Sequence, residues 1–197
     1  MNHPVSILPK LAAPGAGLPK IELFIANLMI HWKARHTSRE AAVATFAGER
    51  EAILRLIAGV SPDQLGKPVL IKRLQGMEDS SRYWSVLMTL DHLRIVNHQI
   101  AGAIASLCRG RIPAQAASIA GVKPDEKVDA SVIAAFETAS AEFVTTVAAQ
   151  TNLRTAVKFS HPWFGPMDAA AWHFMTGFHM SLHRKQIQSI LNAAAAS

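Results

Sequence analysis

Two histidines near the C-terminal end of the chain, His179 and His183, have the spacing of a metal-binding pair. They are four residues apart in the segment HMSLHRKQI. On an α-helix such residues lie about 40° apart around the axis, so both rings can reach one ion. His92, in a second strongly helical segment, can supply a third imidazole. We therefore predict that His92, His179 and His183 bind one divalent transition metal, zinc or nickel before copper or iron, with a fourth position open for water, thiol or substrate.

The same residues also admit a purely structural interpretation. His179 can be an ordinary buried histidine, and His183 can lie on the surface beside Arg184. Gln186 follows His183 by three residues and lies near the same helical face. Its amide can orient a ligand, bond to a substrate or join two helices, and the spacing leaves these roles open.

The remaining histidines are weaker candidates for the metal. His98 and His173 are each six residues from a proposed ligand, about 240° away around a helix, and are expected to point elsewhere. His161 precedes the last helix, on the rim through which a substrate would enter, and its position leaves two roles open, contact with a ligand and stabilisation of the turn. The others are expected on the surface or in an irregular arm: His3, His31 and His36.

Apolar side chains at helical spacing, together with capping residues, predict a chain built from helices. No alternating pattern of useful length predicts a strand, so the expected class is all-α. The predicted fold is an up-down-up-down four-helix bundle with an additional N-terminal helix. An arm and accessory helix occupy 1–36 and the bundle occupies 37–197. The expected helices cover 21–32, 39–58, 81–109, 129–150 and 168–193, and connections cover 62–78 and 110–128, with a helical turn at 115–119.

The expected helix starts allow a check on the proposed metal site. His92 comes eleven residues after Ser81, and His179 comes eleven residues after Asp168. In an up-down-up-down bundle the second and fourth helices run parallel. At about 1.5 Å per residue, both histidines would lie roughly 16 Å below the same end of the bundle.

Composition and charge narrow the possible partners. The 197 residues carry a net charge of +6, but the basic residues are scattered rather than clustered, so we expect no nucleic-acid partner. The single cysteine, Cys108, excludes an internal disulfide, and it lies about 24 Å along the helix from His92, too far to share its ion. The most apolar stretch, 21–30, is too short to cross a bilayer and no signal sequence precedes it. A soluble, cytoplasmic protein without a membrane partner is expected.

Three features together resemble the DinB-like (YfiT-like) metalloprotein family. They are His92, the pattern His179-x-x-x-His183-x-x-Gln186-Ile187, and the turn HPWFGP at 161–166. The resemblance covers roughly 38–193. It implies a four-helix bundle with an unusual connection, a divalent metal on the three histidines, and frequent dimers. Members of that family with known activity include transferases and isomerases that use mycothiol or bacillithiol. Residues 1–36 depart from the family pattern.

Two functional hypotheses follow. In the first, the protein is a metal-dependent transferase or hydrolase that activates a low-molecular-weight thiol or water toward a small molecule. In the second, it is a non-catalytic, small-ligand-binding or stress-related protein whose bundle contains a metal. No acid-base residue is evident beside the three histidines, so catalytic residues stay unassigned. A homodimer is expected in either case.

Overall fold

The computed structural model describes residues 9–196, and most of these residues are helical. Residues 1–8 of the predicted arm, with His3, lie outside the described residues, as does residue 197. The α-helices are α1 (Lys20–His36), α2 (Arg39–Ile57), α3 (Pro62–Gly66), α4 (Val86–Cys108), α5 (Val132–Ala148) and α6 (Ala169–Ala195). The 3-10 helices are η1 (Asp79–Ser81) and η2 (Ala120–Val122), and the strands are β1 (Val69–Leu70), β2 (Tyr83–Trp84), β3 (Phe159–His161) and β4 (Gly165–Met167).

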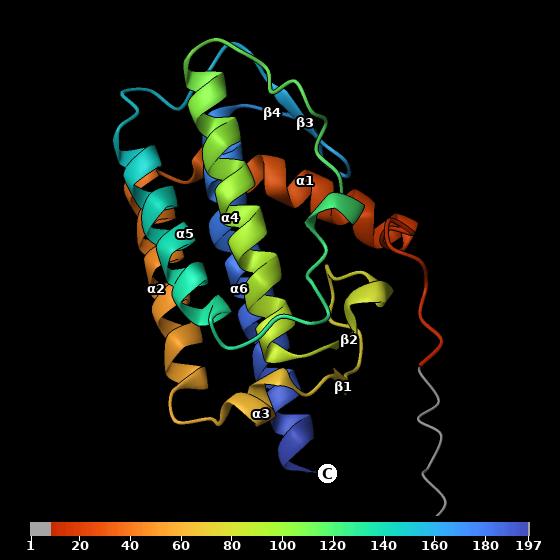
Figure 1. The fold of residues 1–197 in the computed structure, drawn as a ribbon. Helices are drawn as coiled ribbons and strands as arrows, with labels where there is room; N and C mark the ends of the chain where they lie inside the picture. The colour runs from red at the N-terminus through yellow and green to blue at the C-terminus, as the bar shows by residue number, and fades with distance from the viewer. Residues whose placement is uncertain (1–8, 197) are drawn as a thin grey trace, which may run out of the picture.

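Four long helices, α2, α4, α5 and α6, form a bundle (Figure 1). α4 packs against both α5 and α6, and α2 packs against α6. The aromatic centre of the core is made by Phe46, Phe136 and Phe143, which are fully buried. Burying rings of this size is among the largest single contributions to a helical core. The expectation of a four-helix bundle is therefore met at this level.

The alternating order of helix directions is not observed, because α4 and α5 run parallel. Asn97 on α4 bonds to Ser140 on α5, and Cys108 at the end of α4 bonds to Asn152 just past the end of α5. The chain returns along the whole length of α4 through the connection 109–131 before α5 begins (Figure 1). A connection of that length removes the need for consecutive helices to be antiparallel.

The second and fourth bundle helices, α4 and α6, are antiparallel rather than parallel. Gln186, late in α6, bonds to the carbonyl of Ser81 ahead of α4, whereas Asn97, farther along α4, contacts Met180, earlier in α6. The predicted matching of depths from two helix starts is therefore wrong. The histidines still meet, because the beginning of α4 lies beside the second half of α6.

The all-α expectation is wrong in one detail, because the structure contains two short antiparallel sheets. β1 pairs with β2, and β3 pairs with β4. The first pair also explains why α4 begins at Val86 rather than near 81. Tyr83 and Trp84 are extended as β2, and Ser85 then caps the helix by accepting a hydrogen bond from the Met88 amide at 3.0 Å.

The second connection differs from the prediction in the place of its helical turn. Residues 115–119 form no helix, and the turn occurs as η2 instead. η2 lies against α4, and its last residue, Val122, contributes a backbone carbonyl to the candidate site described below.

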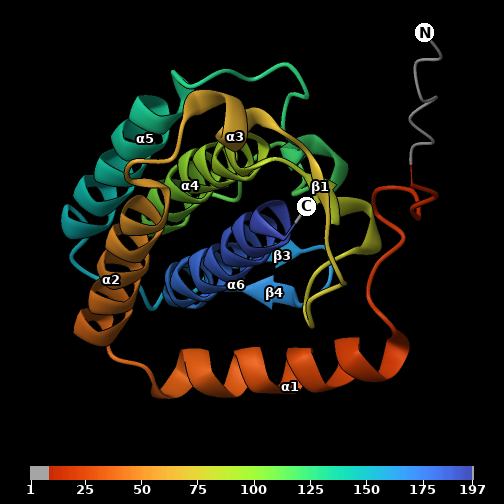
Figure 2. The same ribbon diagram turned by 90° about the horizontal axis from the view of Figure 1, so that it is seen from below.

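The accessory helix α1 lies across α6 on one side of the bundle (Figure 2). Its Asn27 amide donates to the carbonyl of Trp163 at 3.3 Å, and a ring nitrogen of His31 lies 2.8 Å from the carbonyl of Phe164. His31 is half-buried, in contrast to the surface position predicted for it. These bonds join α1 to the aromatic turn 161–166. The division of the chain into 1–36 and 37–197 stays a prediction.

None of the helices between residues 9 and 196 combines the length and the apolar character that crossing a membrane requires.

Candidate metal centre

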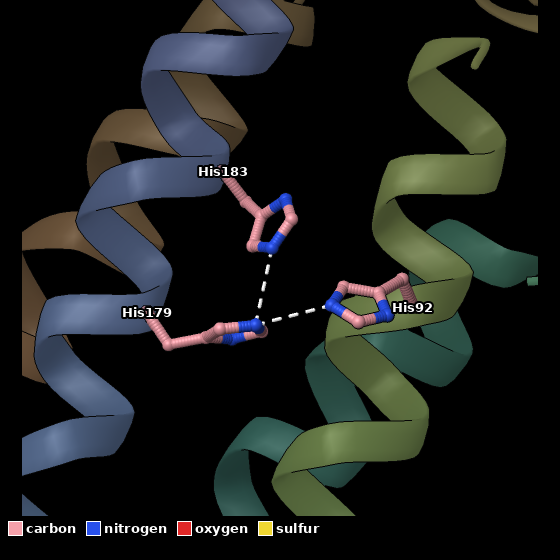
Figure 3. A group of neighbouring side chains, drawn as sticks. All are labelled: His92, His179 and His183. Atoms are coloured by element: carbon pink, nitrogen blue, oxygen red, sulfur yellow. Dashed lines mark hydrogen bonds between the residues drawn. The ribbon is translucent and has the colours of Figure 1, made fainter. Parts of the chain in front are cut away.

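The structure brings His92, His179 and His183 together between α4 and α6 (Figure 3). His179 Nε2 lies 3.0 Å from His92 Nε2 and 3.1 Å from His183 Nε2. One ring nitrogen of each residue lies within 4.8 Å of the other two. A tetrahedral zinc ion with Zn–N distances near 2.1 Å separates its nitrogen ligands by about 3.4 Å. The observed spacing therefore requires only a small expansion to admit an ion.

The connection between α4 and α5 fixes the ring of His92. His92 Nδ1 lies 2.6 Å from the carbonyl oxygen of Val122. A carbonyl oxygen can only accept, so Nδ1 carries the proton and the neutral ring has a bare Nε2. The neighbouring Asp91 holds the same connection by accepting from the Asp125 amide at 3.0 Å. The loop thus selects the tautomer that presents Nε2 to the cluster.

Gln186 fixes the ring of His183 and selects its tautomer in the same way. The side chain of Gln186 is fully buried, and its Nε2 donates to the carbonyl of Ser81 at 2.7 Å. That bond fixes the amide orientation, so its Oε1 is the atom 2.6 Å from His183 Nδ1 and accepts the proton there. Of the roles that the sequence left open for Gln186, the structure therefore shows two together: it orients a histidine and it joins α6 to the segment before α4.

Three converging nitrogens with this protonation pattern form a suitable site for a cation. His92 and His183 both turn bare Nε2 lone pairs toward His179 Nε2. A proton on His179 can bond to only one of them at full strength. His179 Nδ1 is buried and has no hydrogen-bond partner among the described residues. Such an electron-rich, incompletely satisfied cluster fits a divalent transition metal.

Burial disfavours protons at the same three positions. Loss of solvent lowers the pKa of His92 to about 4. Burial, and secondly the charges of neighbouring histidines, hold the pKa values of His179 and His183 well below the usual range. Neutral imidazole is the form that binds metal, so the protein provides the ligands in their binding form.

The other histidines do not join the cluster. His98 is exposed and lies 3.7 Å from Glu142, and His173 is buried with its ring beside Phe143. Both point away from the three ligands, as predicted. His161 lines a cavity next to the cluster and also stabilises the turn 161–166, because its Nδ1 accepts from the Trp163 amide at 3.1 Å. Contact of His161 with a substrate stays a prediction.

We expect His173 to make the protein less stable as the pH falls from about 6.5 to about 4. Its side chain is 2% exposed, and burial, then the charge of Arg39, lowers its pKa to about 4. In the unfolded chain the ring titrates near 6.5, so between these values only the unfolded state gains the proton. The stability is fully present above pH 6.5 and is lost toward pH 4, at about 1.4 kcal/mol per pH unit at most.

Urea denaturation of the metal-free protein between pH 4.5 and 7 measures this effect. His173→Leu should flatten the decline in unfolding free energy, whereas substitution of the exposed His98 by leucine should leave it unchanged. An equal slope in the wild type and in His173→Leu would contradict the assignment.

An apolar cavity of about 140 Å³ opens beside the three histidines. Trp163 and Phe164, in the turn 161–166, line it. Trp84 instead packs against the ligands themselves, with its ring centroid 5.2 Å from that of His92 and 6.2 Å from that of His183. The cavity and the cluster share His92, His179 and His183 as lining residues.

Comparison with known proteins supports the fold alone. No protein-family model matches the chain, and no curated protein matches it. One similar solved structure is the crystal structure of TT2238, a four-helix bundle protein, with a TM-score of 0.57 and 22% sequence identity. The match covers 77% of this chain and 98% of that one. The helical bundle is thus a known arrangement, and the DinB-like resemblance stays a prediction.

Proposed function

We propose that this protein binds one divalent transition metal, zinc or nickel, through His92, His179 and His183. We further propose that it is a DinB-like metal-dependent transferase or hydrolase acting on a small molecule. The observation that carries the proposal is the convergence of three Nε2 atoms, two of them held bare by hydrogen bonds at Nδ1. Residues from two distant segments adopt this arrangement, and hydrogen bonds to Val122 and Gln186 support it.

Such a metal, when bound, supplies a Lewis acid that favours the deprotonated form of a thiol or water at neutral pH. The chain itself contributes the rest of the site. Val122 and Gln186 hold two of the ligands in register, and Trp84 packs against the same two rings. The adjoining apolar cavity receives the substrate and limits access of water to it.

Elemental analysis of the purified protein tests the metal. We expect about one zinc or nickel per chain in the wild type and a large loss in His183→Ala, because two remaining imidazoles bind far more weakly than three. His98→Ala should keep the wild-type content, since His98 is exposed and remote from the cluster. A wild type that stays metal-free after incubation with zinc and with nickel would refute the proposal.

Binding without turnover is a second candidate function, and the cavity wall provides a reason for it. The carboxylate on that wall belongs to Glu78, which accepts hydrogen bonds from the Gly17 amide and the Ser80 hydroxyl. It is therefore occupied in fixing the chain rather than free for proton transfer. Metal-dependent product formation from a thiol and a small electrophile would favour the enzyme, and saturable binding without product would favour the binding protein.

The homodimer also remains a prediction. α1 exposes large apolar side chains to solvent, with Phe24 at 72%, Leu28 at 66% and Trp32 at 59% exposure. Exposed apolar clusters of this kind are frequent at protein interfaces. Light scattering should give twice the chain mass for the wild type and the chain mass for the double variant Phe24→Ser, Leu28→Ser. A monomeric wild type at micromolar concentration would contradict this expectation.

A further inference from the structure

The cavity beside the histidine cluster is sized for a small, largely apolar group. Its volume is about 140 Å³. An engineered protein cavity of about 150 Å³ lined by aliphatic and aromatic side chains binds benzene. The occupant therefore has a body of roughly one aromatic ring or a branched alkyl group. Apolar side chains from α4, α6 and the turn 161–166 form most of the wall: Val96, Ile100, Trp163, Phe164, Met175 and Leu182.

Most polar groups on this wall are already engaged or lie at its edge. The carboxylate of Glu78 is occupied as described above. Ser118 accepts a hydrogen bond from the Gly121 amide at 3.1 Å, and Gln99 is exposed to solvent. Apart from the three clustered histidines, the polar side chains that remain on the wall are those of Ser81, His161, Trp163 and Trp172, and the indole N–H of Trp172 donates to the carbonyl of Phe159 at 3.2 Å. Of these, His161 is the one whose ring is fixed both by hydrogen bonds at Nδ1 and by stacking on a neighbouring ring.

The surroundings of His161 determine which of its nitrogens carries the proton. Its Nδ1 lies 3.1 Å from the amide nitrogen of Trp163 and 3.4 Å from that of Phe164. Amide N–H groups can only donate, so Nδ1 is the acceptor and the proton of the ring is on Nε2. Nε2 has no hydrogen-bond partner among residues 9–196. The ring cannot turn freely, because it stacks on Phe164 with centroids 4.6 Å apart and lies 5.4 Å from the ring of Trp172.

We propose that His161 positions the cavity ligand by donating a hydrogen bond from Nε2 to a carbonyl oxygen of that ligand. The ligand class is a small neutral ketone, aldehyde or ester with an apolar body. A carboxylate fits less well, since an anion in an apolar cavity loses more hydration than one hydrogen bond restores. The role of this bond in catalysis rests on the proposed function, because it is the metal that would make the carbonyl a substrate. The preference of the cavity for a ligand with a carbonyl oxygen does not rest on the proposed function.

Two ligands of nearly the same shape test the hydrogen bond. Acetophenone carries a carbonyl oxygen where α-methylstyrene carries a CH₂ group. The dissociation constants of both are measured by NMR titration of the full-length protein. The quantity of interest is the ratio of the two constants, since the ratio cancels changes in the shape of the cavity.

Two substitutions separate the two nitrogens of His161. In His161→Asn the amide oxygen can take the place of Nδ1 and keep the bonds to the turn, but no donor replaces Nε2. In His161→Gln the amide nitrogen reaches the place of Nε2, and the Nδ1 acceptor is lost. We expect acetophenone to weaken about tenfold relative to α-methylstyrene in the asparagine variant, the effect of one hydrogen bond. The glutamine variant should recover most of that preference.

The same titrations define what overturns the proposal. An unchanged ratio in a folded His161→Asn protein would overturn it, even if both ligands bound more weakly by the same factor. Failure of the wild type to bind either ligand would also overturn it. Repeating the titrations after chelation and in His183→Ala separates the two proposals. A ratio that still depends on residue 161 after chelation would show that the hydrogen bond does not need the metal. The same dependence in a wild type that takes up neither zinc nor nickel would support the role of His161 and reject the metal function. A metal-binding protein without this dependence would do the reverse.

Discussion

Zinc or nickel is expected to raise the melting temperature of the metal-free protein by roughly 8–16 °C. A ligand at a thousand times its dissociation constant stabilises the folded state by about 4 kcal/mol. For a chain of this size each kcal/mol corresponds to about 2–4 °C. The ligands come from α4 and α6, and the segments that they join are 87 residues apart in the chain. Because only the folded state brings these segments together, the metal binds that state and not the unfolded chain, and the shift should be large.

Differential scanning calorimetry of chelated protein, with and without added metal, measures the shift. His179→Ala should abolish it, since His179 Nε2 is the atom that lies beside both other ligands. His98→Ala should preserve it. If His179→Ala shows the same rise as the wild type, the stabilisation comes from a different site and the proposed metal centre is wrong.

Gln186→Leu is expected to weaken metal binding by about 10- to 100-fold. The substitution preserves much of the volume of the side chain but removes the acceptor that fixes His183 Nδ1–H and the donor that satisfies the carbonyl of Ser81. Loss of such a partner of a metal-binding histidine costs affinity in this range, because the ring is no longer held in its binding tautomer and orientation. The two buried groups left unpaired also lower the unfolding free energy by about 1–3 kcal/mol each.

Competition with a chromophoric chelator gives the affinities of the wild type and the variant. Gln188→Leu is the matched control on the same helix, because among residues 9–196 the side chain of Gln188 bonds only to the nearby Asn192. It should bind metal like the wild type. Equal affinities for Gln186→Leu and Gln188→Leu would mean that Gln186 joins the helices without supporting a metal ligand.

The relation between His179, His183 and Gln186 was predictable from the sequence because it lies within one helix. The helical repeat alone puts residues three and four apart on one face, whatever the rest of the chain does. The helical character of the segments was predictable for a similar reason, since apolar spacing and capping residues act locally. The structure also places His92 as the third member of the cluster, but on antiparallel helices and not on the parallel helices of equal depth that the helix starts predict.

Helix direction and the surroundings of the ligands depended on tertiary structure. The connection 109–131 is long enough to return the chain to either end of the bundle, and only the packing of α5 beside α4 decides between them. The start of α4 depended on the pairing of β2 with β1, whose strands are too short to show a period. The carbonyl of Val122 and the accessible Nε2 of His161 have no sequence signature, because backbone groups and tautomers depend on what folds against them.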